Sequence, residues 1–189
     1  MPRLFTALEI PPDLAADLAR MRGGLPGARW IDPERYHLTL RFIGDIDDAM
    51  ARDVHAVLGT IRRPSFNVTL TGIDAFGGAK PRAIVMMARA DPALVALHGE
   101  QEHLMRRIGL VPETRKFTPH ITLARLRHTA PLAVADYIAG CGFWPPRVFK
   151  STHVTLFSAR DSIGGGPYVR EAVYALERSD DSTRSATGR

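Results

Sequence analysis

The stretch WIDPERYHLTLRFIG (residues 30–44) contains the tetrapeptide HLTL at 37–40, and the same His-x-Thr-Leu pattern returns as HITL at 120–123 and HVTL at 153–156. In a β-strand, residues i and i+2 share one face and residues i+1 and i+3 share the other. Each tetrapeptide therefore predicts a strand with an imidazole beside a hydroxyl on one face and two branched apolar residues in a core. A single copy is typical of any half-exposed strand, but repeated copies in one chain favour a chemical role.

Strand-like and helix-like segments alternate unevenly around these tetrapeptides. Short apolar or alternating runs predict strands at residues 4–8, 36–42, 66–70, 83–88, 117–125, 148–157 and 169–176. Prolines, early acidic residues and helical spacing predict helices at residues 11–22, 47–58, 91–108 and 132–138. Because several strands follow one another directly, a pure βαβ series does not fit. We expect an α+β fold of mixed or antiparallel sheets with outer helices, built from two similar lobes.

The composition is typical of a soluble globular protein: 189 residues, 45% hydrophobic and 24% charged. Cys141 is the only cysteine, which excludes an internal disulfide framework. The formal charge of +5 favours polyanionic partners such as RNA, DNA or nucleotides, although many basic proteins bind none of these. No stretch approaches the roughly 18 apolar residues that a membrane span needs, and residues 1–10 are too polar for a signal peptide. We therefore expect a cytoplasmic protein.

The end of the chain differs from the rest. Residues 179–189 contain only Ser, Asp, Thr, Arg, Ala and Gly, which cannot build a packed core. We expect one domain over residues 1–177, followed by a disordered tail over 178–189.

Two such imidazole and hydroxyl pairs, facing each other, suit phosphoryl chemistry without a metal. A neutral histidine can accept a proton from water or an alcohol, while a protonated one gives a proton to the leaving oxygen. Threonine hydroxyls can donate hydrogen bonds to the non-bridging phosphoryl oxygens, where charge grows in the transition state. Arg125 follows Thr122 by three residues, and its guanidinium can hold a phosphate with two parallel hydrogen bonds.

The sequence resembles the two-histidine (2H) phosphoesterases, and within them the RNA 2′,3′-cyclic phosphodiesterases, historically called 2′-5′ RNA ligases. The resemblance rests on RLFTAL at 3–8, WIDPERYHLTLRFIG at 30–44, FTPHITLAR at 117–125 and LFSARDSIGGGPYV at 156–169. It covers about residues 3–177, and two His-x-Thr-x motifs with these flanks are far more specific than either motif alone.

The resemblance implies a bilobal α+β fold: two antiparallel or mixed sheets with outer helices around a central cleft, and one motif in each lobe. Carried over by motif, His37 and Thr39 form the first pair and His120 and Thr122 the second. His37 would be the general acid that protonates the leaving ribose 3′ oxygen, and His120 the general base that activates water. The product would be a 2′-phosphomonoester. Arg125 would contact the phosphate, no cofactor or metal would be needed, and a monomer acting on RNA ends away from membranes is expected.

The third motif is not part of the family pattern, and we interpret His153 as a coincidence of strand alternation. Two alternatives remain open: His153 lines the cleft or replaces a catalytic histidine, or His37, His120 and His153 together bind zinc, which often takes three protein ligands in catalytic sites. The spacing of the three histidines carries no metal signature.

Other candidates are given structural roles. Phe5 and Phe42 lie near the expected cleft, where a ring can stack on a base, but core packing is the preferred interpretation. Arg82 is interpreted as a surface charge, and Tyr168 is left outside the expected site. The glycines at 164–166 predict a turn, because the lysine and helix of a P-loop are missing. The remaining histidines are interpreted as packed or solvated: His55, His98, His103 and His128.

Hydrolysis of RNA 2′,3′-cyclic phosphate ends is the preferred function. The reverse reaction, 2′-5′ ligation to a 5′-hydroxyl, would use the same acid and base, and the sequence does not separate the two. A small cyclic nucleotide is a further substrate to consider. A non-catalytic RNA-binding module is a third alternative, but binding alone needs arginines and aromatic rings and not two paired imidazoles.

Overall fold

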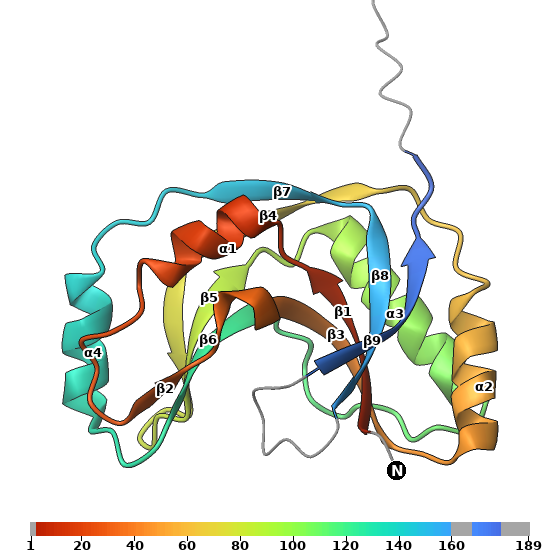
Figure 1. The fold of residues 1–189 in the computed structure, drawn as a ribbon, viewed down its shortest axis with the longest axis horizontal. Coiled ribbons are helices and arrows are strands. Elements are labelled where there is room, and N and C mark those ends of the chain that lie inside the picture. The colour runs from red at the N-terminus through yellow and green to blue at the C-terminus, as the bar shows by residue number, and fades with distance from the viewer. Residues whose placement is uncertain (1–2, 160–167, 179–189) are drawn as a thin grey trace, which may run out of the picture.

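The computed structural model describes residues 3–159 and 168–178 (Figure 1). In chain order the elements are β1 (Arg3–Glu9), α1 (Pro12–Ala19), β2 (Ala28–Trp30), a 3-10 turn (Pro33–Arg35), β3 (His37–Asp45), α2 (Asp48–Leu58), β4 (Phe66–Phe76), β5 (Ala83–Ala88), α3 (Pro92–Arg107), β6 (His120–Leu126), α4 (Pro131–Gly140), β7 (Arg147–Ser151), β8 (His153–Ala159) and β9 (Tyr168–Ala175). The expected turn at 164–166 and nearly all of the expected tail lie outside the described residues.

The strands form one sheet with two halves of four strands each, β7-β4-β5-β6 and β3-β1-β8-β9. Across the sheet the order is β7-β4-β5-β6-β3-β1-β8-β9, with β2 added on β6, and neighbouring strands pair antiparallel. The two halves meet where β3 pairs with β6, through Leu38 and Ile121. α4 and α2 lie at opposite ends of the molecule (Figure 1). The expected α+β fold is confirmed.

Local signals explain where the helices begin. α1, α3 and α4 each have a proline in the first turn, where the missing N–H costs nothing. The side chain of Asp47 caps α2 by accepting a hydrogen bond from the Met50 backbone N–H at 2.8 Å. None of the described helices is long and apolar enough to cross a membrane.

One expected strand was wrong. Residues 148–157 are two strands: β7 pairs with β4 in one half of the sheet, and β8 pairs with β1 in the other. The chain crosses between the halves at Thr152, with no glycine or proline to mark the crossing. Alternation continues through both strands, so the period-2 pattern cannot show that they belong to different halves.

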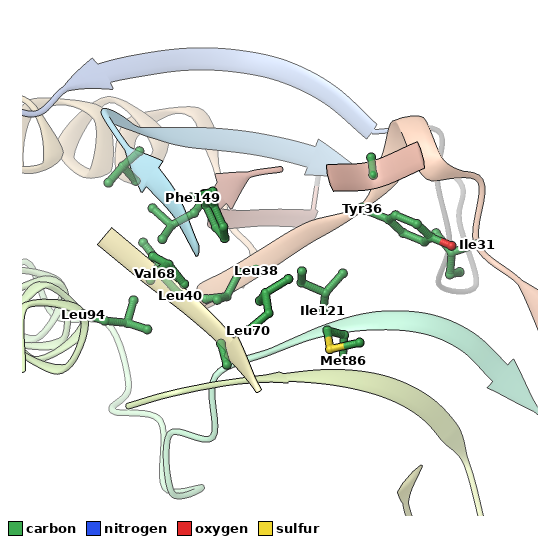
Figure 2. Close-up of a cluster of buried hydrophobic side chains, with 14 of the residues drawn as sticks. Ile31, Tyr36, Leu38, Leu40, Val68, Leu70, Met86, Leu94, Ile121 and Phe149 are labelled. Atoms are coloured by element: carbon green, nitrogen blue, oxygen red, sulfur yellow. The ribbon is translucent and has the colours of Figure 1, made fainter. Parts of the chain in front are cut away.

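The core lies behind the His-x-Thr-Leu motifs. Leu38, Leu40, Ile121 and Leu123 are all at most 3% exposed, as the alternation predicts. Figure 2 shows Leu38, Leu40 and Ile121 among side chains from neighbouring strands, with Leu94 of α3 reaching in from the helix side. The apolar faces of β3 and β6, opposite the faces that carry His37 and His120, are thus fixed in the core.

Candidate active site

A single cleft contains all five residues that the sequence places in the site. It has a volume of about 710 Å³, and its lining includes His37, Thr39, His120, Thr122 and Arg125. This volume lies within the range of roughly 300–1,000 Å³ that is usual for small-molecule sites. The two motifs, far apart in the sequence, therefore face the same space.

The junction of β3 and β6 brings the motifs together. The two strands pair antiparallel at Leu38 and Ile121, the middle apolar residue of each motif. Antiparallel pairing places His37 on the side of Thr122, and Thr39 on the side of His120. An approximate two-fold axis through the Leu38 and Ile121 pair therefore exchanges the first motif with the second.

A β-bulge in each motif decides which later residue reaches the cleft. Thr39 and Arg41 pair with the consecutive residues Ala7 and Thr6, so Leu40 is the extra residue in β3. Leu123 is the extra residue in β6 in the same way. A bulge reverses the alternation after it. The residue three positions after each threonine, Phe42 or Arg125, therefore lines the cleft.

Both histidine rings are fixed by the same backbone contact. His37 Nδ1 lies 2.8 Å from the carbonyl oxygen of Arg35, and His120 Nδ1 lies 2.7 Å from that of Thr118. A carbonyl only accepts, so Nδ1 donates in each case and carries the proton. The Nε2 atoms remain available for proton transfer, which is the tautomer that acid–base catalysis requires.

Aromatic rings pack against both imidazoles. Phe5 and Tyr168 each have a ring centroid 5.1 Å from that of His37, and Phe76 meets His120 edge-on at 4.6 Å. Phe5 is 3% exposed, so it is a core residue that also forms part of the cleft wall. The sequence interpretation left Tyr168 outside the site and missed Phe76, which lies at the end of a strand longer than expected.

The family model described as "LigT like Phosphoesterase" matches residues 8–86 and 87–167, which is most of the chain. The chain belongs to the LigT-like phosphoesterase family. This confirms the family resemblance that the two motifs and their flanks indicate.

Three curated relatives share the same name. A protein from Aeropyrum pernix named RNA 2′,3′-cyclic phosphodiesterase is 33% identical over 117 residues, 58% of this chain and 66% of the relative. Proteins of the same name from Aquifex aeolicus and Escherichia coli are each 30% identical, over 52% and 65% of this chain and 55% and 71% of their own. The chain therefore matches less than two thirds of the length of the first two of these relatives.

Solved structures agree on the fold. E. coli LigT complexed with 3′-AMP superposes with a TM-score of 0.73 at 24% identity, covering 93% of this chain and 99% of that one. A protein of Thermus thermophilus gives a TM-score of 0.77 at 23% identity, covering 93% and 98%. At these identities the likeness establishes the fold alone.

Burial lowers the pKa of both histidines. It lowers the pKa of His37 to about 4, with the charges of Arg125 and His120 adding to the effect and the bond to Arg35 opposing it. Burial also lowers the pKa of His120, and again Arg125 contributes. Arg125 is thus close enough to act on both rings, and it takes part in no ion pair among residues 3–159 and 168–178.

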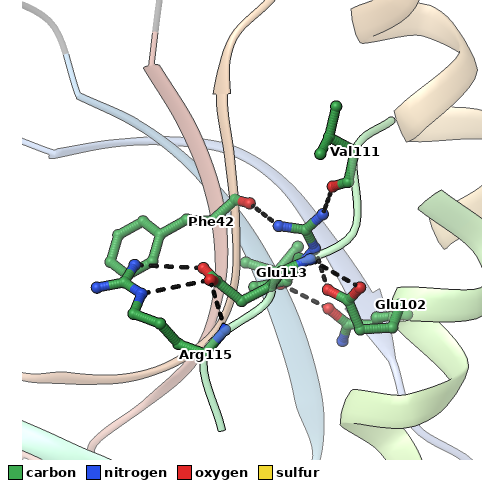
Figure 3. A network of polar contacts seen from close by, with 8 residues as sticks. Phe42, Glu102, Val111, Glu113 and Arg115 are labelled. Carbon is green, nitrogen blue, oxygen red and sulfur yellow. Dashed lines mark hydrogen bonds and ion pairs between the residues drawn. The ribbon is translucent and has the colours of Figure 1, made fainter. Parts of the chain in front are cut away.

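A buried arginine anchors the loop beside the second motif (Figure 3). Arg41 forms an ion pair with Glu102 of α3 and donates hydrogen bonds to the carbonyl oxygens of Phe42 and Val111, each at 2.5 Å. The backbone N–H of Glu113 donates to the Glu102 carboxylate at 3.3 Å. These contacts hold Val111 and Glu113, at the start of the segment that leads into β6.

His153 lies outside the cleft lining. Its Nε2 is 3.5 Å from a Glu9 carboxylate oxygen, to which the Thr155 hydroxyl also donates at 2.6 Å. In the part of the chain that the structure describes, no three histidine, cysteine or acidic side chains are grouped as a metal site. The alternatives that gave His153 a place in the cleft or in a zinc site with His37 and His120 are therefore wrong.

The other candidates divide between the cleft and the surface. His98 lines the cleft and stacks on Phe117 with ring centroids 4.0 Å apart, so it is packed as expected. His55 bonds to the Tyr174 hydroxyl at 2.7 Å, away from the site. Arg82 is exposed and does not line the cleft. Phe42 contradicts its expected core role, because it is 47% exposed.

Proposed function

We propose that this protein hydrolyses RNA 2′,3′-cyclic phosphate ends to 2′-phosphomonoesters, as a monomer and without a metal. The observation that carries the proposal is the pair of imidazoles in one cleft with Arg125, each ring with Nδ1 bound to a backbone carbonyl and Nε2 available. The names of the curated relatives support the RNA substrate. Residues 1–177 act as one bilobal unit in this proposal, because each lobe supplies one motif.

In the proposed reaction, His120 Nε2 takes a proton from water as the water oxygen attacks phosphorus. The bond from phosphorus to the ribose 3′ oxygen breaks, and His37 Nε2 delivers its proton to that oxygen. Thr39 and Thr122 donate hydrogen bonds to the non-bridging oxygens, and Arg125 binds them through its guanidinium. Proton exchange with solvent then returns both histidines to their starting states.

The acid role of His37 depends on the substrate. Its pKa of about 4, set by the protein groups alone, makes it neutral at neutral pH. A phosphodiester anion beside the ring favours the imidazolium and raises this pKa. Substrate binding therefore supplies the charge that keeps the catalytic proton in place.

The direct test incubates the purified protein, in EDTA, with an RNA oligonucleotide that ends in a 2′,3′-cyclic phosphate. We expect a mass gain of one water and a terminus that phosphatase removes. Mapping of the terminal phosphate should place it on the 2′ oxygen. Loss of activity in EDTA that zinc restores would contradict the metal-free reaction, and a 3′-phosphate product would contradict the proposed direction of bond cleavage.

The pH dependence should differ between kcat/KM and kcat. The active form needs one imidazolium and one neutral imidazole, and kcat/KM reports the free enzyme. Because the pKa of both rings is lowered there, this form is lost as pH rises, and kcat/KM should peak below about pH 6.5, the ordinary histidine value. The bound anion raises both pKa values, so the kcat profile should lie at higher pH. Initial rates across the range test this, and coincident profiles would count against it.

A further inference from the structure

Arg29 of β2 lies directly opposite Arg125 of β6. The two residues are register partners in an antiparallel pair, so their side chains stand on the same face of the sheet, with Cβ atoms about 4.5–5.5 Å apart. Arg125 lines the cleft on this face, and Arg29 is exposed just outside the lining. The neighbours of Arg29 in β2, Ala28 and Trp30, pack against the core. Arg29 therefore extends the cationic wall of the cleft by one strand.

No carboxylate of the described residues neutralises this pair of arginines. Neither Arg29 nor Arg125 takes part in an ion pair within the part of the chain that the structure describes. The segments around β2, β5 and β6, residues 23–31, 75–90 and 115–130, contain no aspartate or glutamate. Like charges directly opposite each other destabilise a sheet, and a bound phosphate removes that repulsion. The pair thus indicates room for a second anion beside the one that Arg125 holds.

The backbone of β2 is fixed to β6 at both ends. The Arg127 N–H donates to the Gly27 carbonyl at 3.1 Å, and the Ile31 N–H donates to the Leu123 carbonyl at 2.8 Å. Gly27 has a φ of +76°, and a Cβ there would lie 2.5 Å from the Arg127 carbonyl oxygen, so this approach of the two strands requires glycine. The backbone of Arg29 therefore has one position relative to β6, which lowers the entropy cost of ordering its side chain on a ligand.

The proposed chemistry decides which phosphate lies at Arg29. β6 runs past His37 towards Arg125, because it is antiparallel to β3, and His37 protonates the ribose 3′ oxygen in the proposed reaction. In a ribose, C3′ is bonded to C4′, which carries the 5′ carbon, whereas the base is attached at C1′, next to C2′. The 5′ phosphodiester therefore leaves the sugar on the side of the 3′ oxygen, which is the side of Arg125 and Arg29.

We propose that Arg29 binds the phosphodiester on the 5′ side of the terminal nucleotide, while Arg125 holds the cyclic phosphate beside it. The proposal rests on the proposed function, because it needs the cyclic phosphate between the two histidines. It makes Arg29 a residue that distinguishes the end of an RNA strand from a free nucleoside cyclic phosphate, which has no second phosphate to offer.

The test uses three substrates: a nucleoside 2′,3′-cyclic phosphate, a dinucleotide that ends in the same group, and that dinucleotide with an uncharged methylphosphonate linkage. The wild type should show the highest kcat/KM for the charged dinucleotide. Arg29→Gln should reduce the ratio of kcat/KM for the charged dinucleotide to that for the nucleoside about ten-fold, the usual effect of losing a hydrogen bond to a charged group. Arg29→Lys should recover part of this ratio, because it keeps the charge without the planar pair of donors.

The methylphosphonate isolates the charge of the linking phosphate. With this substrate, Arg29→Gln and the wild type should show the same preference over the nucleoside, because the anion that Arg29 binds is absent. For the charged dinucleotide, Arg29→Gln should also reduce the slope of log(kcat/KM) against log salt by about 0.7, the value for one phosphate contact on a single strand.

Arg52→Gln is the matched control. Arg52 is an exposed arginine that forms no ion pair with any residue that the structure describes. It belongs to α2, whereas β2 packs against α4 through the rings of Trp30 and Tyr137, and α2 and α4 lie at opposite ends of the molecule (Figure 1). The substrate ratios and the salt slope of Arg52→Gln should equal those of the wild type.

Three outcomes would overturn the proposal. Equal losses on the nucleoside and the charged dinucleotide in Arg29→Gln would mean that Arg29 acts on the cyclic phosphate or on the position of β2. An equal change of the ratio for the charged and the methylphosphonate dinucleotides would mean that it does not bind the linking anion. No preference of the wild type for the charged dinucleotide would mean that no second phosphate is bound. Failure of the proposed function is a different result, in which the wild type hydrolyses none of the three substrates.

Discussion

Replacing His120 with Asn should lower kcat on a cyclic-phosphate RNA end by about 10²–10⁴, the usual contribution of one general acid or base. The asparagine amide can donate to the Thr118 carbonyl in place of Nδ1, which keeps the strand start in position. The variant then lacks a group that can accept the water proton in place of His120 Nε2. The His37→Asn exchange should cause a loss of the same order, with the amide bonded to the carbonyl of Arg35.

A modified substrate separates the two roles. When sulfur replaces the ribose 3′ oxygen, the leaving thiolate needs no proton, so general-acid catalysis no longer contributes. His37→Asn should then recover most of the wild-type rate on this substrate, whereas His120→Asn should stay impaired. If His120→Asn recovered and His37→Asn stayed impaired, His120 would be the acid and His37 the base. Equal impairment of both variants would contradict the assignment of separate acid and base roles.

His153→Asn is the matched control for these variants. It changes the same first residue of a His-x-Thr-Leu tetrapeptide, but in a strand whose histidine contacts Glu9 outside the cleft lining. Its activity should equal that of the wild type, with any effect confined to stability. A loss comparable to that of His120→Asn would show that the motif matters for strand structure and not for proton transfer.

Sequence periodicity predicted the two faces of each motif because that property is local. Alternation places His37 and Thr39 opposite Leu38 in any strand, and the structure has Leu38 fully buried and the other two in the cleft. Similarity between the two motifs also predicted one site between two lobes. Both the alternation within each motif and the single shared site can be inferred without knowing the pairing of the strands.

Properties that depend on pairing were not predictable in this way. The bulge at Leu40 turns Phe42 into the cleft, whereas simple alternation and the apolar character of the ring favour the core. Phe76 reaches His120 only because β4 continues to the end of a hairpin with β5. His153 stands in the same tetrapeptide pattern as His37 and His120, and the position of β8 between β1 and β9 separates it from the cleft.

Removing the charge of Arg125 should have two effects that can be measured independently. Arg125→Gln should lower kcat/KM by about 10²–10³, the usual loss when one preorganised donor to a developing oxyanion is deleted. Arg125→Lys keeps the charge but lacks the planar pair of donors, so it should recover only part of the loss. Arg82→Gln removes an exposed arginine outside the cleft lining and should change nothing.

The second effect is on the histidines themselves. The positive charge of Arg125 disfavours the imidazolium form and so contributes to the lowered pKa of both His37 and His120. Its removal should raise both pKa values, and NMR titration of the ring protons in the ligand-free protein measures this without any substrate. The titrations of Arg125→Lys should stay near those of the wild type, because a cation remains.

The two measurements together test whether one guanidinium serves both proton-transfer groups. If only one histidine titration moves in Arg125→Gln, the arginine is not shared, and a phosphate bound to it would not lie between the two rings. If both move and kcat/KM falls, a single anion site lies within reach of the acid and the base. The kcat/KM optimum of Arg125→Gln should then lie at higher pH than that of the wild type, since both ionisations that define it have moved upward.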